Sequence, residues 1–363
     1  MEKFLLLYWG RKGGGAKYSY ELAKAFDKCN VDYNLSLSNN SEYIQEFKNL
    51  QKKTLYLDTY TNKYQFIINS FLLPFKLFAF FSYVKKNEIK HILCTMHHLW
   101  SPFVSIISKY LGINYILIVH DANLHPGDGG FFLQFLLNTD IKQSKKIFCL
   151  SRNVKIQIEE KLINKNKNIL IFPHGPFFYS NDLISIKKES VKNFLFFGRI
   201  SKYKGIELLL DSWSILNKSI PDSKLFIYGN GEMSSDIKKR INLDKSITLV
   251  NRWIEENEVV NIFKKSDVCL LPYLESSQSG VMAISSALGI PVIITPEIGL
   301  IEQIQDLGCG LISESFKPAD FASKTLELVN NINLYNKLAN EGLLRSNKNS
   351  WVNISKNMLE HIF

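Results

Sequence analysis

The sequence predicts an α/β protein made of two doubly wound, parallel-sheet (Rossmann-like) domains that face each other across a cleft. The chain has 363 residues, which is too long for one ordinary hydrophobic core and favours two domains. Short apolar runs alternate with helical patterns along its whole length. Strands that alternate with helices of ten or more residues are typical of βαβ units in parallel sheets.

Eleven apolar runs are predicted as strands, in two series. The first series is Phe4–Trp9, His91–Met96, Tyr115–Val119, Lys146–Leu150 and Ile169–Phe172. The second series is Phe194–Phe197, Lys224–Tyr228, Ile247–Val250, Val268–Leu271, Val292–Thr295 and Cys309–Ile312. A polar, unpatterned segment, Tyr179–Lys192, separates the two series.

These series set the expected domain boundaries. We expect an N-terminal domain over residues 1–180, a linker over 181–192 and a C-terminal domain over 193–349. Residues 350–363 carry apolar side chains at the spacing of an amphipathic helix. This helix either crosses back onto the N-terminal domain or packs simply at the end of the chain.

Composition narrows the class of protein and its partners. The chain is 46% hydrophobic and 21% charged, as in soluble globular proteins, and its five cysteines are far apart, as in reduced cytosolic proteins. Residues 1–185 hold 23 Lys and Arg against 14 Asp and Glu, whereas residues 186–363 hold 21 against 20. The basic first half favours an anionic membrane surface or a pyrophosphate-bearing acceptor, with a solvated basic face as the alternative. We expect no nucleic acid partner, because no known binding module is visible.

The segment Phe66–Val84 is apolar and aromatic and is followed by Lys85 and Lys86. Pro74 and Lys76 interrupt it, and its length barely suffices to span a bilayer. We interpret it first as a helix buried under the sheet that leads into the strand at His91. An interfacial helix lying on a membrane is the second interpretation, and a transmembrane span is the third.

The segment Phe196–Gly205 is the most informative stretch. A buried strand ends at Gly198, and Arg199 and Lys204 follow in a short loop before a helical pattern begins. Open α/β sheets bind ligands at the carboxyl ends of their strands. A guanidinium and an ammonium group at that edge suit the phosphates of a nucleotide, although a solvated turn explains the pair equally well by itself.

The segment Leu270–Thr295 points to the same chemistry. A strand ends near Pro272, and Ser279, Gly280 and Val281 open a helix. The N-terminus of a helix presents free N–H groups and the positive end of its dipole, so it holds phosphate well. Ser279 is a suitable cap, and Gly280 allows close approach of an anion. The alternative is an ordinary capped helix.

Together, these two segments resemble the C-terminal half of family 4 glycosyltransferases. These are retaining enzymes of the two-domain glycosyltransferase-B fold that use nucleotide-sugars. The resemblance extends over essentially the whole chain and depends on the order and spacing of weak motifs. In the N-terminal half these motifs are Gly13-Gly14-Gly15, His120-Asp121 and Pro173-His174-Gly175. In the C-terminal half they are Gly198-Arg199-Ile200, Lys204-Gly205, Tyr228-Gly229-Asn230-Gly231, Gln278-Ser279-Gly280-Val281 and Gly289-Ile290-Pro291-Val292. The stretch from His120 to Gly127 is similar to a subgroup common among bacterial surface-polysaccharide transferases.

The resemblance implies roles for the predicted site residues. Arg199 and Lys204 would neutralise the diphosphate of the donor and stabilise it as a leaving group. The remaining donor-binding positions implied are Gly14, Gly15, Gly198, Gly229, Gly231, Trp253, Ser279, Gly280 and Val281. His120 would contact the donor sugar beside the reacting carbon, although a structural histidine in a turn is the alternative. Asp121, His125 and His174 would lie on the acceptor side.

One departure from the family pattern concerns two glutamates that are commonly eight residues apart. The second position falls on Ile284 and the first on Ser276, beside Glu275. We expect Glu275 to replace the first glutamate and to face the sugar hydroxyls, with a solvated loop carboxylate as the alternative. Ribose binding must then use a residue other than a glutamate at position 284.

The predicted function is that of a cytoplasmic, membrane-peripheral glycosyltransferase acting on surface polysaccharide in a bacterium. It would move a hexose or N-acetylhexosamine from a nucleoside diphosphate-sugar to a lipid-linked saccharide. We expect no metal and no cofactor, because the chain lacks an Asp-x-Asp triplet and His125 with Asp128 matches no metal-site spacing. A nucleotide-sugar epimerase of the same fold and a non-catalytic member of an assembly complex remain as alternatives.

Overall fold

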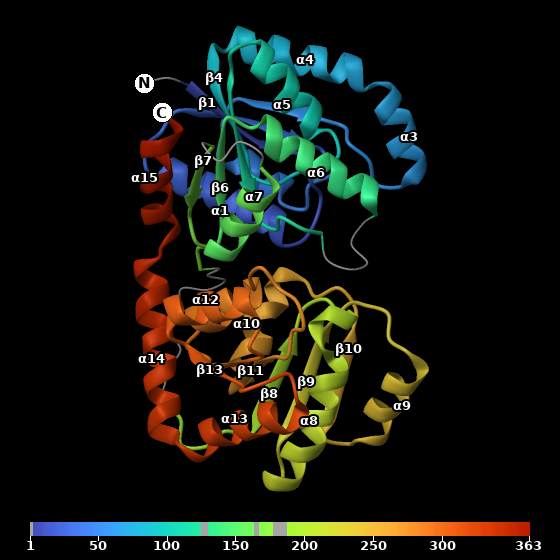
Figure 1. Ribbon diagram of the computed structural model, residues 1–363, viewed down its shortest axis with the longest axis vertical. Coiled ribbons are helices and arrows are strands. Elements are labelled where there is room, and N and C mark those ends of the chain that lie inside the picture. Colours follow the sequence, from blue (N-terminus) through green and yellow to red (C-terminus); the bar gives the residue numbers. More distant parts are fainter. Residues whose placement is uncertain (1–2, 125–129, 163–166, 177–186) are drawn as a thin grey trace. The chain divides into compact units, whose positions relative to one another are not determined.

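The computed structural model describes residues 3–124, 130–162, 167–176 and 187–363. The chain forms two compact units, each a parallel sheet with helices on both faces (Figure 1). Unit 1 comprises Met1–Pro173 together with Trp351–Phe363, and unit 2 comprises His174–Ser350. The predicted fold class, two Rossmann-like α/β domains, is thereby confirmed.

Unit 1 is built on a sheet with the strand order β3-β2-β1-β4-β5-β6-β7 over the described residues. Its strands are β1 (Lys3–Tyr8), β2 (Tyr33–Ser38), β3 (Thr54–Leu57), β4 (Ile89–Cys94), β5 (Asn114–Val119), β6 (Lys146–Cys149) and β7 (Asn168–Ile171). Its helices are α1 (Gly14–Lys28), α2 (Ile44–Asn49), α3 (Lys63–Phe71), α4 (Leu73–Lys86), α5 (Ser101–Tyr110), α6 (Phe131–Gln143), α7 (Arg152–Lys161) and α15 (Trp351–Ile362).

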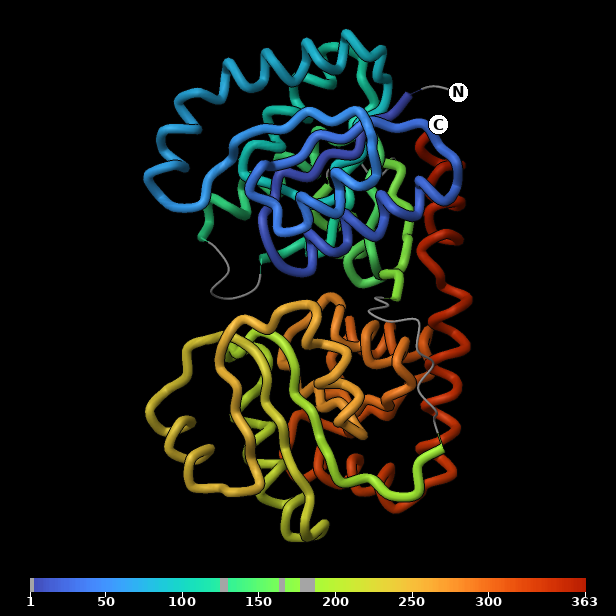
Figure 2. Tube along the Cα trace, turned by 180° about the vertical axis from the view of Figure 1, so that it is seen from behind, coloured from blue at the N-terminus to red at the C-terminus, as the bar shows by residue number. Residues whose placement is uncertain are grey.

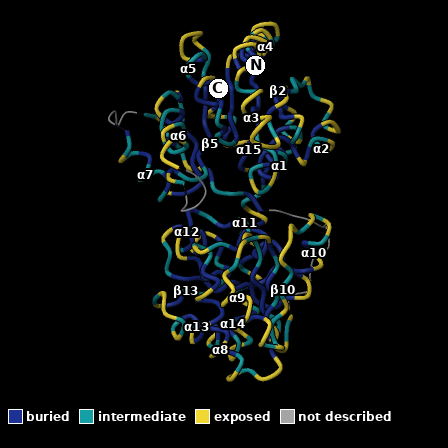
Figure 3. Tube along the Cα trace, turned by 90° about the vertical axis from the view of Figure 1, so that its right-hand side faces the viewer, coloured by how far each residue is buried: buried dark blue, intermediate teal, exposed yellow. Residues whose placement is uncertain are grey.

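The strands of unit 1 form its core, as the dark segments of Figure 3 show. In β1, Phe4 to Tyr8 are at most 2% exposed, because the strand is covered on both faces. Parallel pairing places Leu6 of β1 opposite Leu35 of β2 and Leu93 of β4. The carboxyl ends of the strands therefore lie at one edge of the sheet.

Two strands of unit 1 were not predicted from the sequence. β2 alternates polar and apolar residues, yet all six of its side chains are buried. Its polar side chains are satisfied internally, since Trp9 Nε1 donates to Ser36 Oγ at 3.0 Å and Ser38 Oγ lies 2.7 Å from Thr59 Oγ1. β3 is a four-residue strand at the edge of the sheet, too short for a clear pattern.

The apolar segment predicted as one buried helix forms two consecutive helices, α3 and α4, which Figure 2 shows along the outside of unit 1. Leu73, Leu77, Phe80 and Val84 of α4 are buried, but no residue of α3 is. The prediction of a buried helix therefore holds for one face of α4 alone. No single described helix is long and apolar enough to cross a membrane. The two helices, bent by 65°, pass that test together by length and composition.

Unit 2 is built on a sheet with the order β10-β9-β8-β11-β12-β13 over the described residues. Its strands are β8 (Asn193–Phe197), β9 (Lys224–Gly229), β10 (Ile247–Asn251), β11 (Val268–Leu271), β12 (Val292–Ile294) and β13 (Gly310–Ile312). Its helices are α8 (Ile206–Ser219), α9 (Ser235–Leu243), α10 (Glu256–Lys264), α11 (Gly280–Ala287), α12 (Ile298–Leu307), α13 (Pro318–Asn330) and α14 (Ile332–Lys348). A single 3-10 turn covers Lys202–Lys204 among the described residues.

Much of the predicted linker lies outside the described residues, which resume at residue 187. The described part is tied to unit 2 through the carboxylate of Asp267. Lys188 Nζ donates to Asp267 Oδ1 at 2.6 Å, and the backbone N–H groups of Lys192 and Asn193 donate to Oδ2 at 2.9 and 2.8 Å. These contacts fix the entry of β8 at the centre of its sheet.

The last helix, α15, is grouped with unit 1 although α14 belongs to unit 2. Its Trp351 ring lies edge-on to Tyr18 of α1, with ring centroids 5.0 Å apart. Phe363, just after the helix, contacts the ring of Phe4 of β1. The predicted amphipathic helix therefore packs its apolar face on unit 1.

Candidate functional site

The loop that follows β8 in unit 2 begins at Gly198 and ends at Gly205. A close backbone contact requires glycine at position 205, and a positive φ favours it at position 198. Gly205 has a φ of 70°, and a Cβ atom there would lie 1.8 Å from the carbonyl oxygen of Pro272. A Cβ atom at Gly198, whose φ is 120°, would lie 3.6 Å from Val281 Cγ2. The loop therefore passes directly over the first turn of α11.

The loop after β9 runs beside the loop after β8. Gly198 N–H donates to Tyr228 O at 2.9 Å, and Ile200 N–H donates to Asn230 O at 3.0 Å. A Cβ atom at Gly229 would lie 1.7 Å from the carbonyl oxygen of Gly198, and one at Gly231 would lie 1.8 Å from that of Ile200. Any other residue at either glycine would push the two loops apart. The glycines predicted as donor-binding are thus also structurally necessary.

The two cations predicted to hold phosphate lie on this loop but differ in exposure. Arg199 is exposed, whereas Lys204 is partly buried. The ammonium group of Lys204 lies 3.5 Å from the centroid of the Tyr273 ring, which follows β11 and is 1% exposed. A neutral ring attracts an ammonium group without cancelling its charge. Burial raises the pKa of Tyr273, so this ring stays neutral.

Tyr273 also links Lys204 to α11. Its phenol interacts with the side chain of Ser279, and Leu274 N–H donates to Tyr203 O at 2.8 Å, which joins the loops after β8 and β11. Thr295 Oγ1 donates to the carbonyl oxygen of Tyr273. Sequence reasoning missed Tyr273. A signal was available in the strand-terminal sequence Leu271-Pro272-Tyr273, which places an aromatic residue at the edge where the phosphate loop was predicted.

The N-terminus of α11 is capped as predicted, because Ser279 Oγ accepts from Met282 N–H at 3.3 Å. Gln303 of α12 fixes the cap from the other side: its Oε1 accepts from Ser279 N–H at 2.9 Å, and its Nε2 donates to Ser279 O at the same distance. The backbone N–H groups of Gly280 and Val281 lie in the first turn of the helix. The cap and the hydrogen bonds of Gln303 therefore fix the orientation of these N–H groups before any ligand binds.

The other predicted donor residues of unit 2 lie around this edge. Glu275 is exposed in the loop after β11, and Ile284 is 5% exposed in the core-facing side of α11. A buried isoleucine cannot hold a ribose. Trp253 is 45% exposed after β10. Arg252 beside it donates to Trp253 O at 3.0 Å and to both carboxylate oxygens of Glu258. The hydrogen bond from Arg252 is the main cause that lowers the pKa of Glu258 to about 2.

Unit 1 brings together its own predicted site residues where β1, β4 and β5 end. Helix α1 begins at Gly14 without a side-chain cap, after Gly13 with a φ of 89°. Gly13 N–H donates to Glu42 Oε1 at 2.8 Å, which places a carboxylate beside the first turn. A Cβ atom at Gly15 would lie 3.0 Å from Met96 Sδ, whereas Gly14 faces open space. The exposed backbone at Gly14 is thus the accessible part of this turn.

His120 lies directly after β5, as predicted. Its Nε2 is 3.0 Å from the carbonyl oxygen of Thr95, and its ring is edge-on to Tyr18 with centroids 4.6 Å apart. A carbonyl oxygen accepts only, so Nε2 carries the hydrogen. Burial is the main cause that lowers the pKa of His120, while the bond to Thr95 and the charge of Asp121 raise it. His120 is therefore neutral at pH 7, with its lone pair on Nδ1.

The predicted acceptor-side residues are only partly visible. Asp121 is half-buried beside His120, and His174 Nδ1 lies 2.6 Å from the carbonyl oxygen of Gly175. His125 and Asp128 lie outside the described residues. Across the described ranges, no three His, Cys, Asp or Glu side chains come together in a way that could hold a metal ion.

Comparison with known proteins shows similarity to glycosyltransferases, and the family match lies in unit 2. Residues 191–331 match the family described as "Glycosyl transferases group 1". Over 327 residues the chain is 28% identical to an uncharacterized glycosyltransferase of Methanocaldococcus jannaschii, covering 85% of this chain and 88% of the relative. It is 29% identical over 181 residues to the UDP-Gal:alpha-D-GlcNAc-diphosphoundecaprenol alpha-1,3-galactosyltransferase of Escherichia coli, covering 42% and 43% of the two chains.

Solved structures with the same fold cover nearly the entire chain. The sucrose-phosphate synthase from Thermosynechococcus elongatus superimposes with a TM-score of 0.75 at 17% identity, covering 99% of this chain and 98% of the other. The Anabaena protein Alr3699/HepE in complex with UDP-glucose gives 0.74 at 13% identity, covering 100% and 99%. At these identities the likeness defines the fold, which is that of two-domain glycosyltransferases of the B type.

Proposed function

Because residues 191–331 match the family of group 1 glycosyl transferases, we propose that this chain transfers a hexose or N-acetylhexosamine from a nucleoside diphosphate-sugar with retention at the anomeric carbon. One observation carries the proposal. The Lys204 ammonium group, the loops at Gly198 and Gly229, and the first turn of α11 converge at the carboxyl edge of one sheet in unit 2. Such a site holds a diphosphate.

In the proposed reaction, the bond between the anomeric carbon and the donor diphosphate breaks, and a bond to the acceptor hydroxyl oxygen forms on the same face of the sugar. The departing diphosphate gains negative charge, and the hydroxyl proton passes to it. Lys204, Arg199 and the N–H groups at the start of α11 stabilise that charge without further rearrangement. No divalent ion is needed for this role. Tyr273 positions Lys204 for it.

His120 has a distinct role in the proposal. Since its Nε2–H donates to Thr95 O, Nδ1 is left to accept a hydrogen bond from a hydroxyl of the transferred sugar. A neutral imidazole suits this role better than a cation would, because positive charge builds on the sugar ring in the transition state. The lowered pKa of His120 keeps it neutral at physiological pH.

The first test measures acceptor-dependent release of nucleoside diphosphate. Arg199→Gln and Lys204→Gln are each expected to lower kcat/KM about 150-fold, the effect of losing roughly 3 kcal/mol of transition-state stabilisation. The matched control is Lys202→Gln, which removes an exposed cation from the same turn and should leave the rate unchanged. Wild-type rates in both site variants would overturn the phosphate assignment. Turnover of the donor without any acceptor would favour an epimerase.

We further propose that the acceptor is a lipid-linked saccharide of a bacterial surface polysaccharide and that unit 1 lies on the cytoplasmic face of the membrane. The E. coli relative acts on a diphosphoundecaprenol acceptor by its name. Support comes from the α3–α4 surface, which we define by its exposed apolar side chains: Tyr64, Ile67, Ile68, Phe71, Leu72, Phe75 and Phe78. Monomeric soluble proteins rarely expose so many large apolar groups together.

Charge favours a bilayer as the partner of the α3–α4 surface. Residues 63–86 contain Lys63, Lys76, Lys85 and Lys86 and no acidic residue. Phe71, Phe75 and Phe78 are 80%, 74% and 76% exposed. Taking about 200 Å² for each ring, they present roughly 460 Å² of apolar surface, worth up to about 11 kcal/mol on full burial. Aromatic groups flanked by lysines are typical of interfacial helices on anionic membranes.

Vesicle sedimentation tests this docking surface. The triple variant F71S/F75S/F78S should bind vesicles that contain phosphatidylglycerol at least tenfold more weakly than the wild type. A matched control, L243S/I298S/L344S, removes exposed apolar side chains from unit 2 and should bind as the wild type does. Equal binding by the wild type and the first triple variant would refute the membrane assignment. It would leave the sugar-transfer proposal standing, because that is tested with a soluble acceptor analogue.

A further inference from the structure

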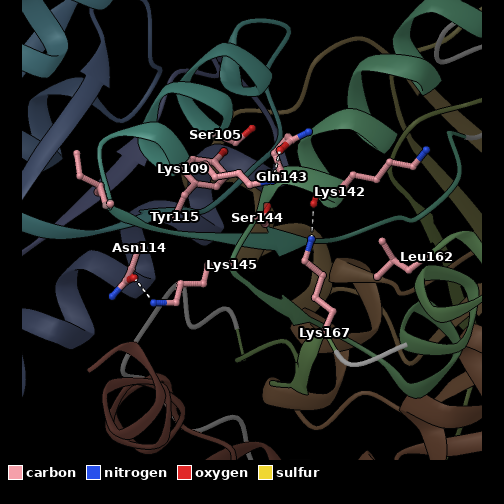
Figure 4. Close-up of a pocket in the computed structure, with 12 residues that line it drawn as sticks. Ser105, Lys109, Asn114, Tyr115, Lys142, Gln143, Ser144, Lys145, Leu162 and Lys167 are labelled. Carbon is pink, nitrogen blue, oxygen red and sulfur yellow. Dashed lines mark hydrogen bonds between the residues drawn. The ribbon is translucent and has the colours of Figure 1, made fainter. Parts of the chain in front are cut away.

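Unit 1 contains a cavity with the character of a binding site, at the edge of the sheet opposite to His120. Its volume is about 590 Å³, within the range of small-molecule sites. It lies at the amino ends of β5 and β6, roughly 17 Å along β5 from the histidine. Its lining includes Lys109, Asn114, Gln143, Lys145, Leu162 and Lys167 (Figure 4).

The cavity is lined by positive charge without compensating negative charge. Four lysines contribute to it, Lys109, Lys142, Lys145 and Lys167, and the described lining residues include no aspartate or glutamate. They come from α5, α6 and the segments before β6 and β7. Because the four lysines come from four separate segments, they do not form the solvated face of a single helix. The fold therefore concentrates about four positive charges around one hollow.

Hydrogen bonds orient three of these ammonium groups while leaving their charges in place. Lys145 Nζ donates to Asn114 Oδ1 at 2.5 Å, and Lys109 Nζ donates to Gln143 Oε1 at 3.3 Å. Lys167 Nζ donates to the carbonyl oxygens of Ile141 and Lys142, at 2.7 and 2.6 Å. All four acceptors are neutral oxygens. Each ammonium group has further N–H donors to offer to a ligand.

The ammonium groups are also close enough to repel one another. Burial, together with the smaller effect of the Lys109 charge, lowers the pKa of Lys167 to about 8. This repulsion is relieved if an anion enters the cavity. Ile113, Tyr115 and Leu162 add an apolar wall beside the lysines. The site thus combines a cationic rim with a surface that accepts a small organic group.

We propose that this cavity binds a phosphate-bearing ligand at an anion site separate from the sugar-transfer site. Phosphoryl oxygens match several ammonium donors at once, and a divalent or trivalent anion matches the charge of the lysines. The volume exceeds that of inorganic phosphate and suits an organic phosphate or diphosphate. The shared chemistry is a phosphoryl group, carried either by a soluble compound or by the headgroup of a lipid.

The test uses site-resolved protection, because pyrophosphate also fits the proposed donor site in unit 2. The intact chain is treated briefly with an amine-acylating reagent at pH 7.5, and the modification of each lysine is measured by peptide mass spectrometry. The lowered pKa makes Lys167 a reactive amine at this pH. We expect millimolar pyrophosphate to slow modification of Lys167 at least fivefold. Sodium chloride of equal ionic strength should slow it less than twofold.

Variants identify the cavity as the cause of protection. Lys109→Gln with Lys145→Gln removes two exposed cations and should abolish the protection of Lys167 by pyrophosphate. The matched control, Lys238→Gln with Lys239→Gln on α9, removes two exposed cations from unit 2 and should retain it. Both double variants should unfold at the wild-type urea concentration, since none of the four side chains is buried.

A second arm distinguishes the two sources of phosphate. Protection by pyrophosphate indicates a soluble ligand, and protection by vesicles of phosphatidic acid alone indicates a lipid headgroup; both outcomes support the site. Protection by neither probe overturns the proposal. It is also overturned if sodium chloride protects as well as pyrophosphate does, or if the Lys109 and Lys145 variant is protected like the wild type. None of these outcomes alters the donor-site prediction for Lys204.

Discussion

The contact between Lys204 and Tyr273 gives a quantitative prediction for donor binding. The ammonium group lies 3.5 Å from the centroid of a ring that is 1% exposed, and a desolvated cation–π contact contributes about 2 kcal/mol. The substitution Tyr273→Leu removes the ring and releases the lysine side chain. Without the ring, Lys204 must be ordered when the diphosphate binds. We therefore expect the donor affinity to fall roughly tenfold to thirtyfold, which corresponds to about 1.4–2 kcal/mol.

The assay is titration calorimetry with the nucleoside diphosphate that raises the melting temperature most in a thermal-shift screen. Tyr273→Phe is the matched control, because it keeps the ring and loses only the phenol that interacts with Ser279. Its donor affinity should stay within about fivefold of the wild type, the effect of one hydrogen bond. Urea unfolding of each variant verifies that the fold is intact before affinities are compared.

A double-mutant cycle decides the mechanism. If Tyr273 acts by holding Lys204, then Tyr273→Leu should have little effect on donor affinity in a Lys204→Gln background. An equal loss of affinity in both backgrounds would refute the reasoning and assign Tyr273 to direct donor contact or to folding. Unchanged affinity on Tyr273→Leu alone would refute it as well.

Three further predictions concern the fold, pH and metal dependence. Gly229→Ala should destabilise the protein by more than about 2 kcal/mol in urea unfolding, since its methyl group would lie 1.7 Å from Gly198 O. As the control, Gly130→Ala places a methyl group with no other atom within 4 Å, so it should leave the free energy of unfolding nearly unchanged. Burial, aided by the charges of His97 and Arg11, lowers the pKa of His98 to about 3, and its Nδ1 accepts from Trp100 N–H at 3.2 Å. The unfolded chain therefore binds more protons between pH 6.5 and 3. The contribution of His98 to the free energy of unfolding is complete above pH 6.5 and falls by about 1.4 kcal/mol per pH unit below it. The variant His98→Gln should lose that part of the pH dependence of stability. An unchanged pH dependence in the variant would show that His98 is not buried as a neutral ring. Transfer activity should persist in excess chelator. Loss of activity that manganese restores would contradict the proposed metal independence.

The sequence by itself determined the fold class and most of the sheet. Parallel strands are buried on both faces, so the runs Phe4–Trp9 and Phe194–Phe197 are apolar throughout and visible without coordinates. The loop at Gly198 could be placed for the same reason, because a strand end, a glycine and two cations follow one another in the chain. β2 was missed because its buried Asn34, Ser36 and Ser38 make it look solvated, and hydrogen-bond partners for such residues come from distant segments.

Only the tertiary structure decided which side chains meet and which surfaces stay uncovered. Tyr273 lies under Lys204 because β8 and β11 are neighbours in the sheet, although the two residues are far apart in the sequence. The apolar composition of residues 66–84 predicted a helix, but it did not reveal that α3 buries none of its residues in the core. The lysine-lined cavity likewise requires four segments to end at one edge. The local pattern of apolar and polar residues determines which helices and strands form. Long-range packing depends on the whole chain at once, and it determines which side chains meet to form a site.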